Sequence, residues 1–136
     1  MEILKSMVSL PLDYIFVCCG GGGLLAGIAA YVKRVRPNVK VIGVEAADAA
    51  GMTESIKAGR VVTLDHVGLF ADGAAVRTVG DETYRICSQL VDDMVTVDTD
   101  QICNAIKLSY NDAYVFYCNW LWCLLACLLP SLLLLS

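Results

Sequence analysis

The sequence predicts an α/β fold in which a parallel β-sheet lies between two layers of helices, giving a three-layer domain. Three short runs of β-branched and apolar residues alternate along the chain with segments of helical periodicity, which is typical of buried parallel strands joined by helices. The connections between these runs are long enough for right-handed crossovers. Four consecutive glycines, Gly20 to Gly23, separate the first run from the first helical segment.

Residues 13–18, with the sequence DYIFVC, are expected to form the first strand because this short apolar run ends at the glycines. From residue 24 to residue 35, apolar side chains recur at the spacing of one buried helix face. Cationic residues gather at the end of this segment, where they suit the negative end of the helix dipole, and Pro37 stops the helix.

The middle of the chain continues the alternation. Residues 40–46 predict a second buried strand, and residues 51–58 predict a short helix that Gly59 can cap. A brief strand and an extended loop both remain open for residues 61–64. Residues 65–80 contain several glycines and are expected to form a loop.

The last part of the domain adds two helices and a strand. Residues 81–93 open with acidic side chains and carry apolar residues at helical spacing, so a helix is expected there. Residues 94–97, with the sequence MVTV, predict the third strand. Asp98 and Gln101 have the spacing of a capping box, which predicts the start of a helix that runs through Lys107.

The sequence changes character near its end. No charged residue follows Asp112, and the segment is rich in leucine and aromatic residues. We therefore divide the chain into an α/β domain at 1–107 and a divergent hydrophobic tail at 108–136. The tail has the length of a membrane span, but it also fits a buried helix or sequence foreign to the domain. We favour the last, because the change is abrupt and falls inside a predicted helix.

Composition restricts the partners and the compartment. A net charge of −4 and the lack of a long basic run argue against nucleic acid as a partner. The seven cysteines have no zinc-site spacing, and the sequence lacks the loop-rich character of a disulfide scaffold. We expect reduced, mostly buried thiols, with Cys18 and Cys19 as packing residues. The opening residues do not resemble a secretory signal.

The four glycines are expected to bind an anion. A glycine-rich turn between a parallel strand and a helix exposes a row of backbone amides at the positive end of the helix dipole, and phosphate oxygens can approach where side chains are missing. A tight turn that packs the strand on the helix would need only one glycine. We therefore interpret Gly20, Gly21, Gly22 and Gly23 as a phosphate cradle.

One phosphate ligand suggested by this pattern is a dinucleotide. Gly21, Gly23 and Ala26 fit the relaxed G-x-G-x-x-A fingerprint, and Glu45 stands at the end of the next strand, where an acid would bind a ribose. A glycine quartet satisfies this fingerprint almost automatically, so its specificity is low. A nucleoside triphosphate loop is excluded because no Gly-Lys-Ser/Thr follows.

Four blocks that follow one another along the chain resemble the threonine dehydratase (threonine ammonia-lyase) family. They read FVCCGGGGLLAGIAAYVK, VKVIGVEAADAAGMTESIKAG, VGLFADGAAVRTVGDETYRIC and VDDMVTVDTDQICNAIK, and the resemblance spans residues 1–107. These are fold-type II pyridoxal-phosphate lyases, with serine racemase and serine dehydratase as relatives. The resemblance implies that pyridoxal 5′-phosphate is the cofactor and that its phosphate is held by the amides of Gly20, Gly21, Gly22, Gly23 and Leu24.

The resemblance also implies a substrate and a setting. The family converts L-threonine to 2-oxobutanoate and ammonia for isoleucine biosynthesis, and L-serine is the alternative substrate. Full-length members are expected to be homo-oligomers in the cytoplasm, or in a plastid or mitochondrion of a eukaryote. Contact of the tail with a membrane is the less favoured option.

Several other residues are candidates for a role at a site. Glu45 resembles the position of a divalent-metal ligand in serine racemase, but Gly51 stands where a second carboxylate is needed, so a strand-end carboxylate is favoured and no metal site is assigned. Asp72 and Gly73 resemble a family loop beside the cofactor, and a simple Asp-Gly turn is equally consistent. His66 is expected on a loop surface, and the acids Asp92, Asp93, Asp98 and Asp100 are expected to form a solvated cluster.

This chain is expected to have no dehydratase turnover by itself. The Ser-x-Lys-x-Arg-Gly type motif that carries the Schiff-base lysine of the family does not occur in the sequence, so no catalytic residue is assigned and a non-catalytic product stays open. The measurement is the formation of 2-oxobutanoate from L-threonine by the purified chain. Turnover that Gly22→Asp abolishes would contradict this expectation.

Overall fold

The computed structural model describes residue 4 and residues 11–113. Its strands and helices alternate along the chain, as the sequence predicts. They are, in order, β1 (Tyr14–Cys18), α2 (Gly23–Val35), β2 (Lys40–Ala46), α3 (Gly51–Ala58), α4 (Asp81–Leu90), β3 (Asp93–Val97) and α5 (Thr99–Ala113), with the short 3₁₀ helices η1 (Ala47–Ala49) and η2 (Asp72–Ala74).

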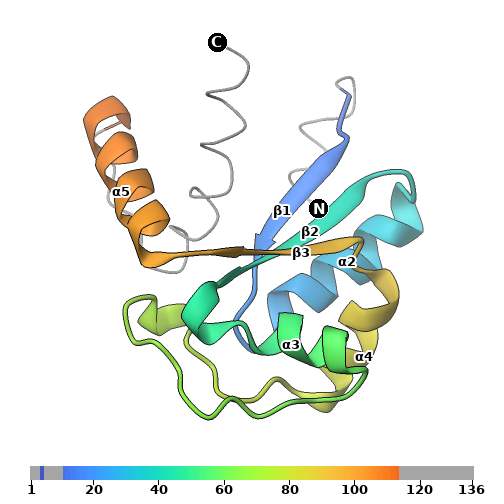
Figure 1. Ribbon diagram of the computed structural model, residues 1–136. Coiled ribbons are helices and arrows are strands. Elements are labelled where there is room, and N and C mark those ends of the chain that lie inside the picture. Colours follow the sequence, from blue (N-terminus) through green and yellow to red (C-terminus); the bar gives the residue numbers. More distant parts are fainter. Residues whose placement is uncertain (1–3, 5–10, 114–136) are drawn as a thin grey trace.

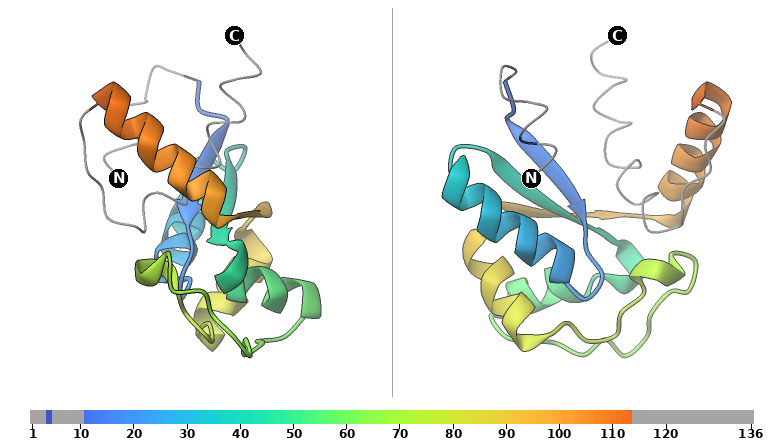
Figure 2. Two further views of the ribbon diagram at one scale, coloured as in Figure 1. Left: turned by 60° about the vertical axis from the view of Figure 1, so that its left-hand side comes forward. Right: turned by 180° about the vertical axis from the view of Figure 1, so that it is seen from behind.

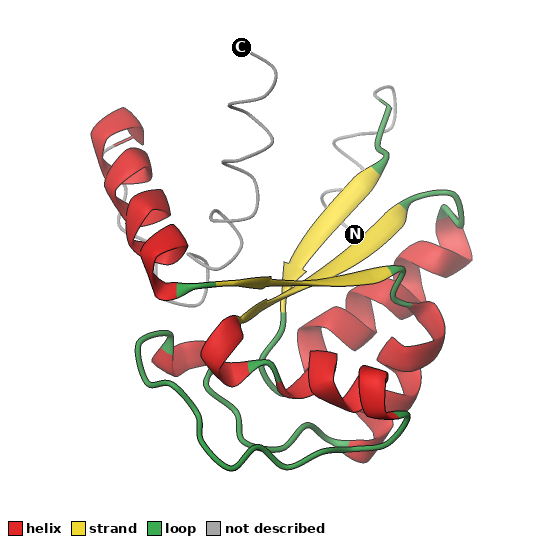
Figure 3. Ribbon diagram, in the orientation of Figure 1, coloured by secondary structure: helices red, strands yellow, loops and turns green. Residues whose placement is uncertain are grey.

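The three strands form one parallel sheet with the order β1-β2-β3. Tyr14 lies opposite Lys40 in the first pair, and Ile42 lies opposite Asp93 in the second. Helices α2, α3 and α4 cover one face of the sheet, and α5 lies on the other face (Figures 1 and 2). Figure 3 shows the sheet between these two layers of helices. The structure therefore confirms the predicted three-layer α/β architecture.

Because side chains alternate between the faces of a strand, the sheet has a separate apolar core on each face. On the first face, Val17 and Val41 pack with α2 and with Met52 of α3. On the second face, Cys18 and Val44 pack with α5. The side chains of both cores include several that are almost fully buried, such as Val17 and Val41 on one face and Cys18 and Val44 on the other.

Most of the predicted element bounds are confirmed. β2 and α3 have the expected limits, and Gly59 ends α3 in the left-handed conformation, with φ of 67°. α2 begins one residue earlier than expected, at Gly23. Residues 61–64 do not form a strand; the described chain has only an isolated bridge between Thr63 and Thr78 there.

The prediction of a helix over residues 81–93 is wrong at its end. α4 stops at Leu90, and Val91 is already extended, with ψ of 132°. The side chain of Asp92 accepts a hydrogen bond from the Val41 amide at 2.8 Å, and the Asp92 amide donates to the Val41 carbonyl at 3.0 Å. These contacts with β2 compete with the helix and draw the chain into β3.

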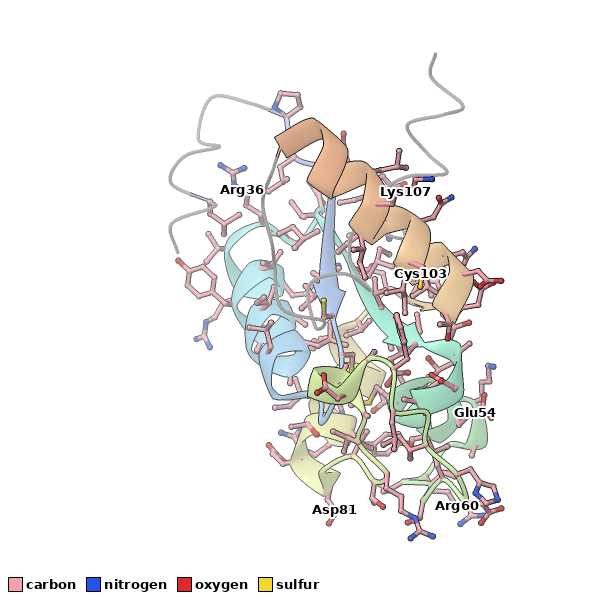
Figure 4. The ribbon with its side chains drawn as sticks, turned by 90° about the vertical axis from the view of Figure 1, so that its left-hand side faces the viewer. Arg36, Glu54, Arg60, Asp81, Cys103 and Lys107 are labelled. Carbon is pink, nitrogen blue, oxygen red and sulfur yellow. The ribbon has the colours of Figure 1, made fainter. Side chains whose placement is uncertain are left out.

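The start of α5 has the predicted capping box. The Gln101 amide donates to Asp98 Oδ1 at 2.8 Å, and the Asp98 amide donates to Gln101 Oε1 at 2.9 Å. The helix continues past Lys107 to Ala113, so the proposed boundary at 107/108 falls inside it. Cys103 and Lys107 both lie along this helix (Figure 4).

Of the predicted hydrophobic tail, residues 108–113 belong to α5, and residues 114–136 lie outside the described residues. Within the part of the chain that the structure describes, no helix has the length and apolar character needed to cross a membrane. The membrane-like, buried and foreign interpretations of the tail therefore stay predictions.

Asp92 is more than the solvated acid that the sequence suggested. It forms ion pairs with Lys33 at the end of α2 (2.6 Å) and with Lys40 at the start of β2 (3.1 Å). Desolvation raises the pKa of this carboxyl, but the hydrogen bonds from Lys33, the Val41 amide and Lys40 outweigh it and lower the pKa from 3.8 to about 2. Asp92 therefore ties together α2, β2 and β3.

Replacing Asp92 is expected to reduce stability in a pH-dependent way. A pKa that is depressed in the folded state stabilises the fold above pH 4, and this contribution is lost as the pH falls towards 2. Asp92→Asn should lower the free energy of unfolding by about 1 kcal/mol at pH 7, because the pairs are partly exposed and the amide oxygen still accepts a hydrogen bond.

Urea unfolding at pH 7 and at pH 2.5 measures this effect. The difference between Asp92→Asn and the parent should shrink at the lower pH. Asp65→Asn is the matched control, since this exposed loop residue makes no ion pair in the described structure. An equal loss at both pH values would contradict the ionic role.

Candidate functional site

The glycine loop connects the end of β1 to the start of α2. The Cys19 amide donates to the Val44 carbonyl at 2.8 Å, which is the last ladder contact before the loop. Gly22 then adopts the left-handed conformation, with φ of 86°, and its carbonyl accepts the first helical hydrogen bond from Ala26 at 2.8 Å. This conformation lets the chain turn directly from a buried strand into a helix.

Two of the four glycines are required by packing. A side chain on Gly22 would be strained by the positive φ, and its Cβ would overlap the methyl group of Met52 and approach Thr83 Cβ to 3.1 Å. A Cβ on Gly20 would lie 3.2 Å from the carbonyl oxygen of Ala74 in η2, which is tighter than usual. Contacts with neighbouring protein atoms therefore explain why these two positions are glycine.

The other two glycines have no such explanation. A Cβ added to Gly21 or Gly23 would meet nothing within 4 Å, and both residues are exposed. If the four glycines served packing alone, larger residues would fit at these two open positions. The space over Gly21 and Gly23 is therefore where a ligand can approach the backbone.

The amides of the loop are available to such a ligand. None of the residues that the structure describes accepts a hydrogen bond from the backbone amides of residues 20–25. The first turn of α2 contains no acidic residue, so the positive end of the helix dipole is not neutralised there. Unpaired amides at the start of a helix suit an anion such as a phosphate group, and the role of Gly20–Gly23 and Leu24 in binding it stays a prediction.

The carbonyl side of the loop faces α4. Thr83 Oγ1 lies 2.8 Å from the Gly21 carbonyl oxygen, and Cys87 Sγ lies 4.0 Å from that of Gly22. Asp81, at the start of α4, and Arg36, beyond the end of α2, lie at opposite ends of the domain (Figure 4). Sequence reasoning missed Thr83, because it is 62 residues from Gly21 and no local pattern marks the contact.

Glu45 is a buried carboxylate that accepts hydrogen bonds from the start of α3. Its side chain is 1% exposed, and it accepts hydrogen bonds from the Met52 amide (2.9 Å), the Thr53 amide (2.8 Å) and the Thr53 hydroxyl (2.7 Å). It therefore caps the start of α3 from β2. Burial raises the pKa of Glu45 despite these hydrogen bonds. The dinucleotide hypothesis loses its ribose-binding acid.

The thiols near the loop are packing groups, as expected. Cys18 and Cys19 are each 1% exposed, and both are free thiols. Burial, followed by the nearby Glu45 carboxylate, raises the pKa of the Cys19 thiol, and the same two causes raise the pKa of Cys87 to about 11. A raised pKa keeps a thiol protonated and unreactive.

The remaining candidate residues lie in the loop between α3 and α4. His66 is exposed, as predicted. Asp72 and Gly73 begin η2, whose Ala74 packs on Gly20, so this segment lies next to the glycine loop. The Gly73 amide donates to Asp72 Oδ1 at 2.7 Å, which is a local turn contact. A role of Asp72 towards a substrate stays a proposal.

Comparison with known proteins identifies the family. Residues 1–117 match the family described as pyridoxal-phosphate dependent enzyme, which is more than half of the chain. The chain belongs to this family. Pyridoxal phosphate is the cofactor of the family, and its phosphate group has the charge and size that the amides of the glycine loop can accommodate.

Threonine dehydratases are among the relatives that this chain resembles. It is 56% identical over 112 residues to the biosynthetic L-threonine dehydratase of Burkholderia multivorans, covering 82% of this chain and 22% of the relative. It is 61% identical over 107 residues to the biosynthetic chloroplastic threonine dehydratase of Arabidopsis thaliana, covering 79% of this chain and 18% of the relative. The chain thus spans about a fifth of the length of these relatives.

Solved structures have the same fold. The processed threonine deaminase isoform 2 of Solanum lycopersicum has a TM-score of 0.87 and 40% identity, over 92% of this chain and 36% of that one. Maize serine racemase has a TM-score of 0.85 and 31% identity, over 92% of this chain and 38% of that one. These similarities confirm the fold-type II resemblance predicted from the sequence.

Stability should separate the glycines of the loop. Gly22→Ala is expected to lower the free energy of unfolding by about 2 kcal/mol, because it combines a positive φ with the contacts to Met52 and Thr83. Gly27→Ala, at an open position within α2, is the matched control and should raise it by about 0.5 to 1 kcal/mol through helix propensity. Chemical denaturation measures both, and equal effects would contradict this assignment.

Proposed function

We propose that this chain forms the cofactor-phosphate part of a pyridoxal-phosphate-dependent threonine ammonia-lyase, which converts L-threonine to 2-oxobutanoate and ammonia in isoleucine biosynthesis. The observation that carries the proposal is the row of backbone amides in residues 20–25, with open space over Gly21 and Gly23. The identity to biosynthetic threonine dehydratases, at 50% or more, supports the choice of substrate.

The roles of the chain in that enzyme follow from its geometry. Pyridoxal phosphate supplies an electron sink for the carbanion formed at the α-carbon of an amino acid. The amides of Gly20, Gly21, Gly22, Gly23 and Leu24 would bind the phosphate group, and the start of α2 would add favourable potential. The φ of Gly22 orients these amides, and the packing of Met52 and Ala74 holds the loop in place.

The second candidate is a serine racemase or serine dehydratase. It is favoured by the fold similarity to maize serine racemase, but the identity of 31% is lower than that to the threonine dehydratases. Both enzymes act on a small hydroxy amino acid with the same cofactor. We therefore keep L-serine as an alternative substrate and rank L-threonine first.

We also propose the setting of the protein. Residues 1–107 form the partial pyridoxal-phosphate-binding domain, and residues 108–136 form the divergent tail. The full-length enzyme is a homo-oligomer. Relatives from Schizosaccharomyces pombe and Arabidopsis thaliana are named mitochondrial and chloroplastic, which supports a plastid or mitochondrion for a eukaryotic source. For a bacterial source we propose the cytoplasm.

Binding of pyridoxine 5′-phosphate tests the proposed cradle. This probe has the phosphate and ring of the cofactor but no aldehyde, so it does not react with surface lysines. The chain should bind it more tightly than pyridoxine, and Gly23→Ala should weaken its binding about tenfold, because a methyl group would enter the space that the phosphate occupies.

Isothermal titration measures the dissociation constants of both probes. Gly27→Ala is the matched control, since its position is equally open but lies one turn further along α2. The control should bind as the parent does. Equal affinity for pyridoxine and pyridoxine 5′-phosphate would overturn the proposal, and preferential binding of a nicotinamide dinucleotide would favour the alternative ligand.

A further inference from the structure

We infer that Thr83 is a positioning residue for the phosphate cradle: its hydroxyl group fixes the peptide plane between Gly21 and Gly22 so that the amides of the loop face the ligand. This inference rests on the proposed function. It assigns to α4, a helix outside the loop, a part in anion binding that acts through the backbone of the loop.

The first step of the argument is the number of acceptors that Thr83 has. Its Oγ1 lies 2.8 Å from the Gly21 carbonyl and 2.9 Å from the Gly80 carbonyl, but a hydroxyl group has one proton to donate. The Gly80 carbonyl already accepts the Tyr84 amide at 2.9 Å. Among the described residues, the Gly21 carbonyl has no donor except Thr83. We therefore assign the hydroxyl proton of Thr83 to the hydrogen bond with the Gly21 carbonyl.

The second step is the geometry of a peptide group. Its carbonyl and its N–H point in opposite directions because the group is planar and trans. When Thr83 holds the Gly21 carbonyl towards α4, the Gly22 amide is held on the opposite side, away from that helix. A second contact also directs a loop carbonyl towards α4. Cys87, one turn further along this helix than Thr83, has its Sγ 4.0 Å from the Gly22 carbonyl oxygen.

The third step is the rigidity of this contact. Thr83 Cβ and Oγ1 would both lie 3.1 Å from a Cβ added to Gly22, so the side chain is in close contact with the loop. α2 and α4 belong to the same apolar core, through Leu25, Ala29 and Cys87. The hydroxyl is thus carried on a helix that cannot move independently of the loop, and it can preorganise the amides before a ligand arrives.

The experiment compares three variants of the full 136-residue chain with the parent. Thr83→Val keeps the shape but removes the hydroxyl, Thr83→Ser keeps the hydroxyl, and Thr63→Val is the matched control, because it alters an exposed threonine whose hydroxyl contacts Thr78. The probes are pyridoxine 5′-phosphate and pyridoxine. Their dissociation constants, and the amide NMR shifts of residues 20–25, are measured for each chain.

Thr83→Val should weaken binding of pyridoxine 5′-phosphate about fivefold and leave binding of pyridoxine unchanged. Thr83→Ser should restore the affinity to within about twofold of the parent, and Thr63→Val should not change it. A residue with a purely structural role would weaken both probes together. The selective loss and its rescue by serine would therefore support the inference.

Other outcomes overturn it in distinguishable ways. If the parent discriminates between the probes and Thr83→Val does so equally well, the inference fails and the proposed function stands. If Thr83→Ser loses as much as Thr83→Val, the hydroxyl is not the cause. If the parent binds both probes equally, both proposals fail.

A measurement on the parent covers the case in which Thr83→Val does not fold. Binding of pyridoxine 5′-phosphate should then shift the ¹³C resonances of the Gly21 carbonyl and the Thr83 methyl group, because the two groups are coupled through the hydrogen bond. Resonances that stay in place while the amides of the loop respond would overturn the inference.

Discussion

The left-handed backbone of Gly22 is the constraint on which the candidate site depends. A chain that leaves a buried strand and enters a helix within a few residues has to reverse the direction of its peptide groups, and a positive φ does this in one step. Met52 and Thr83 fill the space that a side chain on this residue would need. The turn is therefore held by α3 and α4, two helices that come later in the chain. The conformation of this turn sets the direction in which the amides of the loop point.

Met52 reaches this position because of a buried carboxylate. Glu45, at the end of β2, accepts the amides of Met52 and Thr53 and thereby starts α3 beside the sheet. Burying a carboxylate is costly, but three hydrogen bonds from the start of a helix offset much of the cost. The acid that resembled a ligand-binding group is thus part of the support for the loop, and the groups proposed to bind the phosphate are backbone amides.

The features that could be predicted from the sequence are local ones. Asp98 and Gln101 marked the start of α5, and Gly59 marked the end of α3, because capping depends on residues a few positions apart. The glycine quartet predicted an anion site for the same reason. The choice between a dinucleotide and pyridoxal phosphate came from the resemblance to a family, since both ligands present a phosphate to similar loops.

The features that could not be predicted depend on contacts between distant residues. Asp92 was assigned to α4, but its bonds to Val41, 51 residues away, place it beside β2. Thr83 has no signal of its own, because its acceptor lies in a loop that precedes it by 62 residues. The hydrogen bonds of Glu45 to the start of α3 have no local signal either, since they join a strand to a helix that follows it. In each case the packing of the whole fold, and not a local pattern, decides which residues meet.

The four consecutive glycines of the loop therefore have two different physical roles. Gly20 and Gly22 lack side chains because protein atoms occupy the space, whereas Gly21 and Gly23 lack them although the space is empty. Packing residues are constrained by stability, and open residues are constrained only by what approaches from outside. Since α2 and α4 hold the loop from the protein side, the outer side is free to match an anion without any change in the core. This separation allows one compact junction to serve both folding and binding.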